Sequence, residues 1–79
     1  MNERRKSPRQ RVYKSALIVV GDTALTFECV AKNISQHGAR VALSTTYGVP
    51  ANFDVIIGGT RRSSRSVWRT NTEIGLAFE

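Results

Sequence analysis

The chain has 79 residues, of which 41% are hydrophobic and 23% are charged, and its formal net charge is +6. This length excludes a multidomain protein and limits the fold to burying about 60% of the surface that the unfolded chain exposes. The single cysteine, Cys29, excludes an internal disulfide and a multi-cysteine metal site, and it indicates a reducing compartment. We expect a cytoplasmic protein without membrane insertion, because the chain has neither a signal-peptide apolar segment nor an apolar run long enough to span a bilayer.

Residues 1–11 are predicted to be a flexible basic arm. They contain the run Arg4-Arg5-Lys6-Ser7-Pro8-Arg9-Gln10-Arg11, which has no apolar side chain to bury. Half of the 12 basic residues lie between Arg4 and Lys14, and Pro8 disfavours a helix at the residue before it. The guanidinium groups suit phosphate oxygens or the O6/N7 edge of guanine. A solvated tail is the alternative interpretation.

Residues 12–79 read as one domain of six short strands. Alternating apolar residues and turn formers predict strands at 12–20, 23–32, 39–43, 52–57, 63–69 and 73–78. Turns or loops are predicted between them at 21–22, 33–38, 44–51, 58–60 and 70–72. With no amphipathic helix, this pattern predicts a small all-β barrel or sandwich. A six-stranded antiparallel β-barrel is preferred, because closure leaves no exposed strand edge.

Four of the predicted strands have one face directed into the barrel. In 23–32, Leu25, Phe27, Cys29 and Ala31 share that face, and Val30 is an exception on the polar side. The later inward residues are Ala39, Val41, Leu43, Phe53, Val55, Ile57, Ile74, Leu76 and Phe78. The predicted turn at 33–38 displays polar atoms at one end of the sheet, and Gly38 there would take positive φ or allow close approach to the backbone.

Two motifs carry a resemblance to a known family. The arm contains Arg5-Lys6-Ser7-Pro8-Arg9, and the turn reads Asn33-Ile34-Ser35-Gln36-His37-Gly38. Followed by Val67-Trp68-Arg69 and Ile74-Gly75-Leu76-Ala77-Phe78, they resemble the Arg-x-x-x-Arg and Asp/Asn-x-Ser-x-x-Gly motifs of the PilZ domain, a bacterial receptor for cyclic di-GMP. The resemblance covers nearly the whole chain. One departure is that the chain stops at Glu79 without the long C-terminal helix often found in that family, so we expect no dimerisation or output through such a helix.

The resemblance implies roles for individual residues. It implies that the arm wraps over a ligand on the barrel surface, with Arg5 and Arg9 gripping phosphate and guanine. Asn33 and Ser35 would orient a base, and Gly38 would permit its close approach. Arg4 is a candidate helper, and the candidate secondary contacts are Arg40, Arg65 and Trp68. The alternative role for Trp68 is simple packing. The alternative role for the basic cluster is a solvated face; its members are Arg61, Arg62, Arg65 and Arg69. If the strand alternates, Arg65 and Arg69 share a face.

Three functions are compatible with this sequence. The favoured one is a stand-alone cyclic di-GMP receptor that signals to an unidentified effector protein by rearranging its arm, as a monomer or weak homodimer, with outputs such as motility or exopolysaccharide regulation. A small basic barrel that binds nucleic acid is less favoured, because aromatic residues make up only 8% of the chain and give few platforms for base stacking. A PilZ-like adaptor that binds no nucleotide is the third. We expect no enzyme, metal or cofactor, since one histidine, His37, one cysteine and six scattered acids assemble no catalytic or metal cluster.

Overall fold

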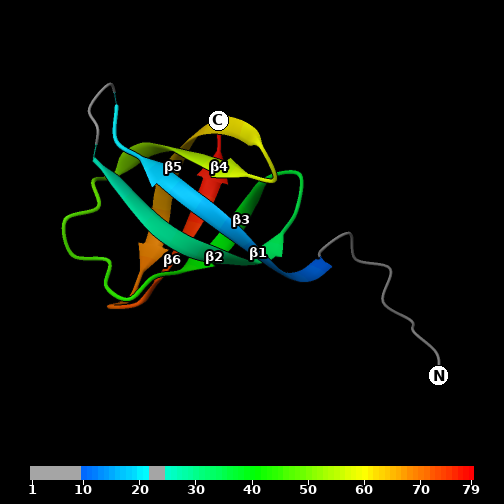
Figure 1. Cartoon of the computed structure of the whole chain (residues 1–79), viewed down its shortest axis with the longest axis horizontal. Coiled ribbons are helices and arrows are strands. Elements are labelled where there is room, and N and C mark those ends of the chain that lie inside the picture. The colour runs from blue at the N-terminus through cyan, green and yellow to red at the C-terminus, as the bar shows by residue number, and fades with distance from the viewer. Residues whose placement is uncertain (1–9, 22–24) are drawn as a thin grey trace.

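The computed structural model describes residues 10–21 and 25–79, which form six strands and, within those residues, no helix (Figure 1). The strands are β1 (Gln10–Val19), β2 (Thr26–Ile34), β3 (Gly38–Ala42), β4 (Asn52–Ile57), β5 (Thr60–Arg69) and β6 (Glu73–Phe78). The all-β prediction and the count of six strands are confirmed. No helix in the described part of the chain has the length and apolar character to cross a membrane.

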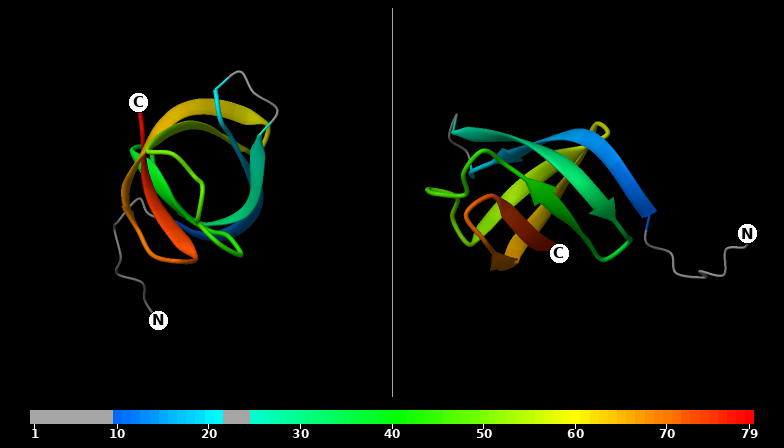
Figure 2. Two further views of the ribbon diagram at one scale, coloured as in Figure 1. Left: turned by 90° about the vertical axis from the view of Figure 1, so that its left-hand side faces the viewer. Right: turned by 90° about the horizontal axis from the view of Figure 1, so that it is seen from below.

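The strands close into a barrel in the order β1-β2-β3-β6-β5-β4, and β4 pairs again with β1. Figure 2, in its left view, looks along the barrel and shows the strands as a ring. Every pairing is antiparallel. β3 pairs with β6 rather than with β4, because segment 43–51 leaves β3 and crosses one end of the barrel before β4 begins. The predicted closure is confirmed, and it removes the exposed edges on which other strands would pair.

The barrel core receives a fully buried or nearly fully buried side chain from every strand. Five apolar side chains have no exposed surface, and the sixth strand, β5, contributes Ser64 with 1% exposed. These five are Ile18, Ala31, Val41, Val55 and Ile74. The Ser64 hydroxyl donates to the Arg62 carbonyl oxygen at 3.3 Å, so this buried polar group is satisfied. The inward faces of the predicted strands are therefore largely confirmed, but Leu25 is 50% exposed just before β2 begins.

The hairpin between β4 and β5 follows from its two glycines. Gly58 and Gly59 have φ of 61° and 84°, and Ile57 pairs with Thr60 on either side of them. Positive φ at both central residues is the requirement of a type I′ turn, whose twist matches that of the flanking strands. The turn prediction at 58–60 is correct in place, but Thr60 already belongs to β5, which begins three residues earlier than predicted.

Other strand limits also differ from the prediction, most clearly the start of β1 and the end of β2. β1 begins at Gln10, because Gln10 and Arg11 pair with Ile34 and Asn33. β2 accordingly continues to Ile34, and the expected turn at 33–38 is reduced to residues 35–37. Cross-strand pairing overrides the local turn preference of Asn33 here. The predicted start of the second strand at Thr23 lies outside the described residues.

The end of the barrel opposite the 35–37 turn is closed by segment 43–51. Val49 is buried there with only 5% of its surface exposed, and the Thr46 hydroxyl donates to the Thr70 carbonyl oxygen at 2.6 Å. The Arg69 guanidinium donates to the carbonyl oxygens of Thr46, Val49 and Pro50 at 3.2, 2.7 and 3.2 Å. This arginine therefore ties the segment to β5.

Candidate functional site

The turn between β2 and β3 is held by its own serine. The Ser35 backbone N–H donates to the Gly38 carbonyl oxygen at 2.9 Å, and its hydroxyl oxygen accepts from the His37 N–H at 3.2 Å. The hydroxyl also donates to the Gly38 carbonyl oxygen at 3.4 Å. The Phe78 N–H of β6 donates to the His37 carbonyl oxygen at 2.9 Å. The polar turn is therefore closed by its own hydrogen bonds and joined to the C-terminal strand, with Ser35 half-buried at its start.

Gly38 is needed for the packing of two strands. A Cβ at this position would collide with the Leu76 carbonyl oxygen and would lie 3.2 Å from the Ala77 Cα, both of which are main-chain atoms of β6. Gly38 is not among the glycines with positive φ. Of the two expectations from the sequence, positive φ is therefore wrong and close backbone approach is correct, with β6 as the group that approaches.

A β-bulge turns Asn33 to the outside of the barrel. If the alternation of buried Cys29 and Ala31 continued, Asn33 would face the core. The β2–β3 register instead shifts between Ala31 and Asn33, with Lys32 as the extra residue, and Asn33 pairs with Arg40. Arg40 lies next to fully buried Val41 and therefore faces outward. Since cross-strand partners share a face, the bulge places the Asn33 amide beside the Arg40 guanidinium.

A second bulge turns Trp68 to the same outer face. The β5–β6 register shifts between Ser66 and Trp68, so that Val67 is the extra residue and Trp68 pairs with Gly75. A Cβ on Gly75 would overlap the indole atoms Nε1, Cε2 and Cζ2 of Trp68. The indole therefore lies on the bare backbone of β6, where it covers Gly75 and remains 45% exposed.

These two bulges align one cross-strand row. Asn33, Arg40, Gly75 and Trp68 are successive partners across β2, β3, β6 and β5. The backbone of Arg11 on β1 extends the row beyond Asn33. The row therefore runs from the strand that follows the basic arm to the tryptophan, over five neighbouring strands.

A surface groove of about 520 Å³ lies over this row and the adjoining turn. It is lined by Asn33, Ile34, Ser35, His37, Gly38, Ala39, Arg40, Trp68 and Leu76. The structure thus brings together five residues that the sequence singled out from three separate segments: Asn33, Ser35, Gly38, Arg40 and Trp68. Arg65 is not part of the lining. Arg4, Arg5 and Arg9 lie outside the described residues.

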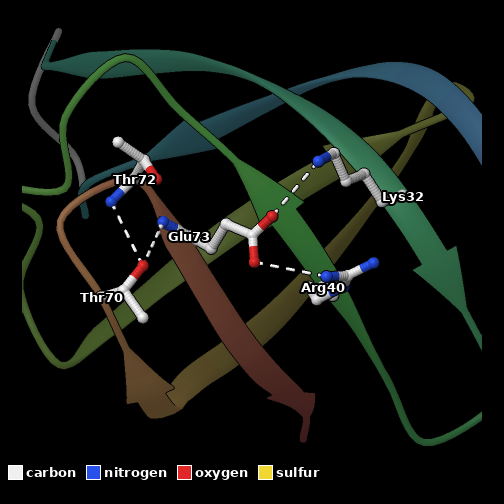
Figure 3. Close-up of polar contacts among 5 residues, drawn as sticks. All are labelled: Lys32, Arg40, Thr70, Thr72 and Glu73. Atoms are coloured by element: carbon white, nitrogen blue, oxygen red, sulfur yellow. Dashed lines mark hydrogen bonds and ion pairs between the residues drawn. The ribbon is translucent and has the colours of Figure 1, made fainter.

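Glu73, for which no role was predicted from the sequence, forms ion pairs with two cationic side chains beside this groove. One oxygen of Glu73 lies 3.2 Å from the Lys32 Nζ, and the other lies 3.3 Å from the Arg40 Nη1 (Figure 3). Thr70 holds the start of β6 in place, because its hydroxyl oxygen accepts from the N–H groups of Thr72 and Glu73 at 3.3 and 3.0 Å. The only sequence signal for Glu73 was a lone acid between a Thr-Asn-Thr turn and an apolar strand.

The arginines of β5 do not form one basic surface with the groove. Arg61 pairs with the Asp54 carboxylate at 2.7 Å, and Arg65 pairs with Glu79 at 3.1 Å. The Arg62 guanidinium carbon lies 4.1 Å from the centre of the Phe78 ring. Because the bulge at Val67 reverses the alternation, Arg69 pairs with buried Ile74 while Arg65 pairs with Ala77. The expectation that Arg65 and Arg69 share a face is therefore wrong.

The remaining reactive groups have structural surroundings. Burial raises the pKa of the Cys29 thiol from 9.0 to about 11, so this thiol stays protonated at neutral pH. His37 lines the groove on the exposed turn. Within residues 10–21 and 25–79, no three side chains of histidine, cysteine, aspartate or glutamate are grouped as metal ligands.

The fold and the groove define a small closed β-barrel that presents an amide, a guanidinium and an indole face beside a polar turn. The PilZ domain model matches residues 3–79. The chain therefore belongs to the PilZ domain family, whose members are non-catalytic receptor domains for cyclic di-GMP. A search of curated proteins finds no match.

Proposed function

We propose that this chain is a receptor that binds cyclic di-GMP in the groove at the 35–37 turn and clamps the ligand with Arg5 and Arg9 of the basic arm. The observation that carries the proposal is the convergence of Asn33, Ser35 and Arg40 with Trp68 around one groove of about 520 Å³. Binding then orders the arm against the barrel, and the rearranged arm alters the contact with an effector protein.

The groove chemistry matches a cyclic purine dinucleotide. The ligand offers two phosphates, flat purine faces and guanine edges with O6 and N7 acceptors. Arg40 keeps N–H donors beside the groove, and the exposed part of the Trp68 indole offers a face on which a purine can stack. A base stacked there would lie over the same cross-strand row as the Asn33 amide, with Arg40 and Gly75 between the two residues.

The chain path supports participation of the arm. Gln10 and Arg11 pair with Ile34 and Asn33, which adjoin the groove. Arg9 is the residue directly before Gln10, and an extended chain advances about 3.3–3.6 Å per residue. Arg5, five residues before Gln10, is therefore tethered within about 18 Å of this point, and its long side chain adds further reach. Arg4 is one residue more distant and would serve as a helper.

We expect binding without turnover. Groove residues supply hydrogen-bond donors, an aromatic face and positive charge, and none of Asn33, Ser35 or Trp68 is paired with a general base. Purified protein incubated with cyclic di-GMP should release no linear dinucleotide or GMP. The appearance of either product would contradict a receptor role.

The decisive experiment is isothermal titration of the full chain with cyclic di-GMP, with GTP as the ligand control. We expect an Arg5→Ala, Arg9→Ala double variant to lose at least about tenfold in affinity, because each charge-assisted contact is worth about 1.5–3 kcal/mol. Arg61→Ala, Arg65→Ala is the matched control, since it removes the same charge from ion pairs outside the groove. If the two double variants weaken binding equally, the arm contributes only through its overall positive charge, and the proposed contacts of Arg5 and Arg9 are wrong.

Trp68 provides a second readout because it is the only tryptophan in the chain. Ligand stacking on the indole should change its fluorescence, and Trp68→Phe should keep an aromatic platform while abolishing the signal. If single-stranded nucleic acid binds instead, the affinity should fall steeply with salt, whereas a ligand with two phosphates gives a shallow dependence. If neither ligand binds, the receptor proposal is wrong and an adaptor role replaces it.

A further inference from the structure

Four residues beside the groove form a closed ring of polar contacts. Lys32 and Arg40 each bind one oxygen of the Glu73 carboxylate, at 3.2 and 3.3 Å. With the Asn33 amide oriented to satisfy both of its ends, its oxygen accepts from the Arg40 Nε at 3.1 Å and Nη2 at 3.2 Å, and its nitrogen donates to the Lys32 carbonyl oxygen at 3.1 Å. The ring therefore links Glu73 to Asn33 through Arg40 on one side and Lys32 on the other.

The ring limits what Asn33 can offer a ligand. An amide oxygen has two acceptor positions, and Arg40 occupies both with Nε and Nη2. The amide nitrogen has two N–H donors, and the Lys32 carbonyl takes one of them. One N–H group therefore remains, and Asn33 faces the groove as a donor without a free acceptor.

From this arrangement we infer that Glu73 is a positioning residue that sets base selectivity by holding Arg40 against the Asn33 amide. The inference rests on the proposed function and extends it to a residue that does not line the groove. A single remaining donor matches the guanine O6 acceptor and opposes the adenine N6 amino group, which is itself a donor. Without Glu73, Arg40 is free to turn away, the amide can reverse, and its oxygen can accept from adenine.

The geometry favours this role over a purely stabilising one. The side chains of Lys32, Arg40 and Glu73 are 32%, 38% and 23% exposed, and partly exposed ion pairs contribute little to folding. The position of Glu73 is nevertheless fixed independently of its charge, because its backbone N–H donates to the Thr70 hydroxyl. A Glu73→Gln variant should therefore fold normally while losing the ion pair that holds Arg40.

The first test needs no ligand. In ¹H–¹⁵N spectra, Glu73→Gln should shift the Asn33 side-chain NH₂ signals and the Arg40 Nε–H signal, with Asn33→Ala identifying the former by their loss. Asp54→Asn is the matched control, because it removes one negative charge from the ion pair between Asp54 on β4 and Arg61 on β5. This variant should leave the Asn33 and Arg40 signals in place. Unchanged Asn33 signals in a folded Glu73→Gln variant would overturn the positioning role.

The second test measures selectivity as the ratio of the dissociation constants for cyclic di-AMP and cyclic di-GMP. Glu73→Gln should lower this ratio by about tenfold, because one hydrogen-bond mismatch at a base edge is relieved. Asp54→Asn should leave the ratio within about twofold of the parent value. In an Asn33→Ala background, Glu73→Gln should have no further effect, since it acts through that amide.

The outcomes separate this inference from the proposed function. A parent chain that binds neither dinucleotide overturns the proposed function and the selectivity role together, while the ligand-free spectra still decide whether Glu73 positions Asn33. Cyclic di-GMP binding with an unchanged ratio in Glu73→Gln overturns the inference alone. A full effect of Glu73→Gln in the Asn33→Ala background also overturns it, because Glu73 would then act by charge.

Discussion

Replacing Gly75 with alanine tests whether the tryptophan platform depends on a bare backbone. The added methyl group would overlap three indole atoms of Trp68, so the indole must leave β6. The φ of Gly75 is not positive, and alanine can adopt this backbone conformation without strain. The effect of Gly75→Ala therefore reports the Trp68 contact rather than the conformational freedom of glycine.

The size of the effect follows from the buried part of the indole. A tryptophan that buries about 150–250 Å² when covered, and that here is 45% exposed, retains about 80–140 Å² of contact worth about 2–3.5 kcal/mol. Displacement sacrifices only part of this area, and alanine recovers about 0.4–1 kcal/mol by restricting the unfolded chain. We expect a net destabilisation of about 1–2 kcal/mol, at about 4–8 °C of melting temperature per kcal/mol.

Thermal unfolding and tryptophan emission provide the assay. The emission of Gly75→Ala should shift to longer wavelength because the indole gains water, and the affinity for cyclic di-GMP should fall if Trp68 is the stacking platform. In a Trp68→Ala background the same substitution should be neutral or slightly stabilising, since no indole remains to be displaced. A Gly75→Ala protein with parental stability and emission, or one equally destabilised without Trp68, would refute this explanation.

Three further outcomes are expected. Gly38→Ala should lower the free energy of unfolding in urea by about 2–3 kcal/mol even without ligand, because the methyl meets the main-chain carbonyl of Leu76, which cannot rotate away; parental stability would contradict the close approach of β3 and β6. Arg69→Ala should lower the free energy of unfolding by about 1–3 kcal/mol, because segment 43–51 is released from β5. Arg69→Lys should restore only part of this free energy, since an ammonium group cannot span three carbonyl oxygens. Because the pKa of Cys29 is raised from 9.0 to about 11, the folded chain keeps a proton between these pH values that the unfolded chain releases. The stability that this proton contributes is complete below pH 9.0 and is lost as the pH rises toward about 11, at a slope of at most about 1.4 kcal/mol per pH unit. Cys29→Ala should remove this slope from the free energy of unfolding measured against pH.

The residues of the turn motif stabilise the fold, in addition to the binding roles proposed for them. Ser35 supports its own turn with its hydroxyl, and Gly38 makes room for a neighbouring strand. A loss of ligand affinity in variants of either residue is therefore informative only beside a stability measurement. Asn33 lies on the outer face of the barrel, where a substitution separates binding from folding more cleanly.

Much of the architecture could be predicted from local patterns. Period-2 alternation identifies most inward residues of four strands, because a one-sided strand must bury one face whatever its partners are. Gly58-Gly59 predicts a hairpin through its tolerance of positive φ. The turn motif and its spacing from the arm indicate the family, and the family model confirms that assignment over residues 3–79.

Only the tertiary structure determines which side chains meet in the groove. A bulge depends on the pairing of two strands, and alternation within one strand does not reveal it. Without the shift at Lys32, Asn33 would point to the core, and without the shift at Val67, Trp68 would do so. Glu73 likewise acquires its partners from β2 and β3, which are distant in sequence. The residue types were visible in the chain, but their common outer face arises from register shifts between strands that closure brings side by side.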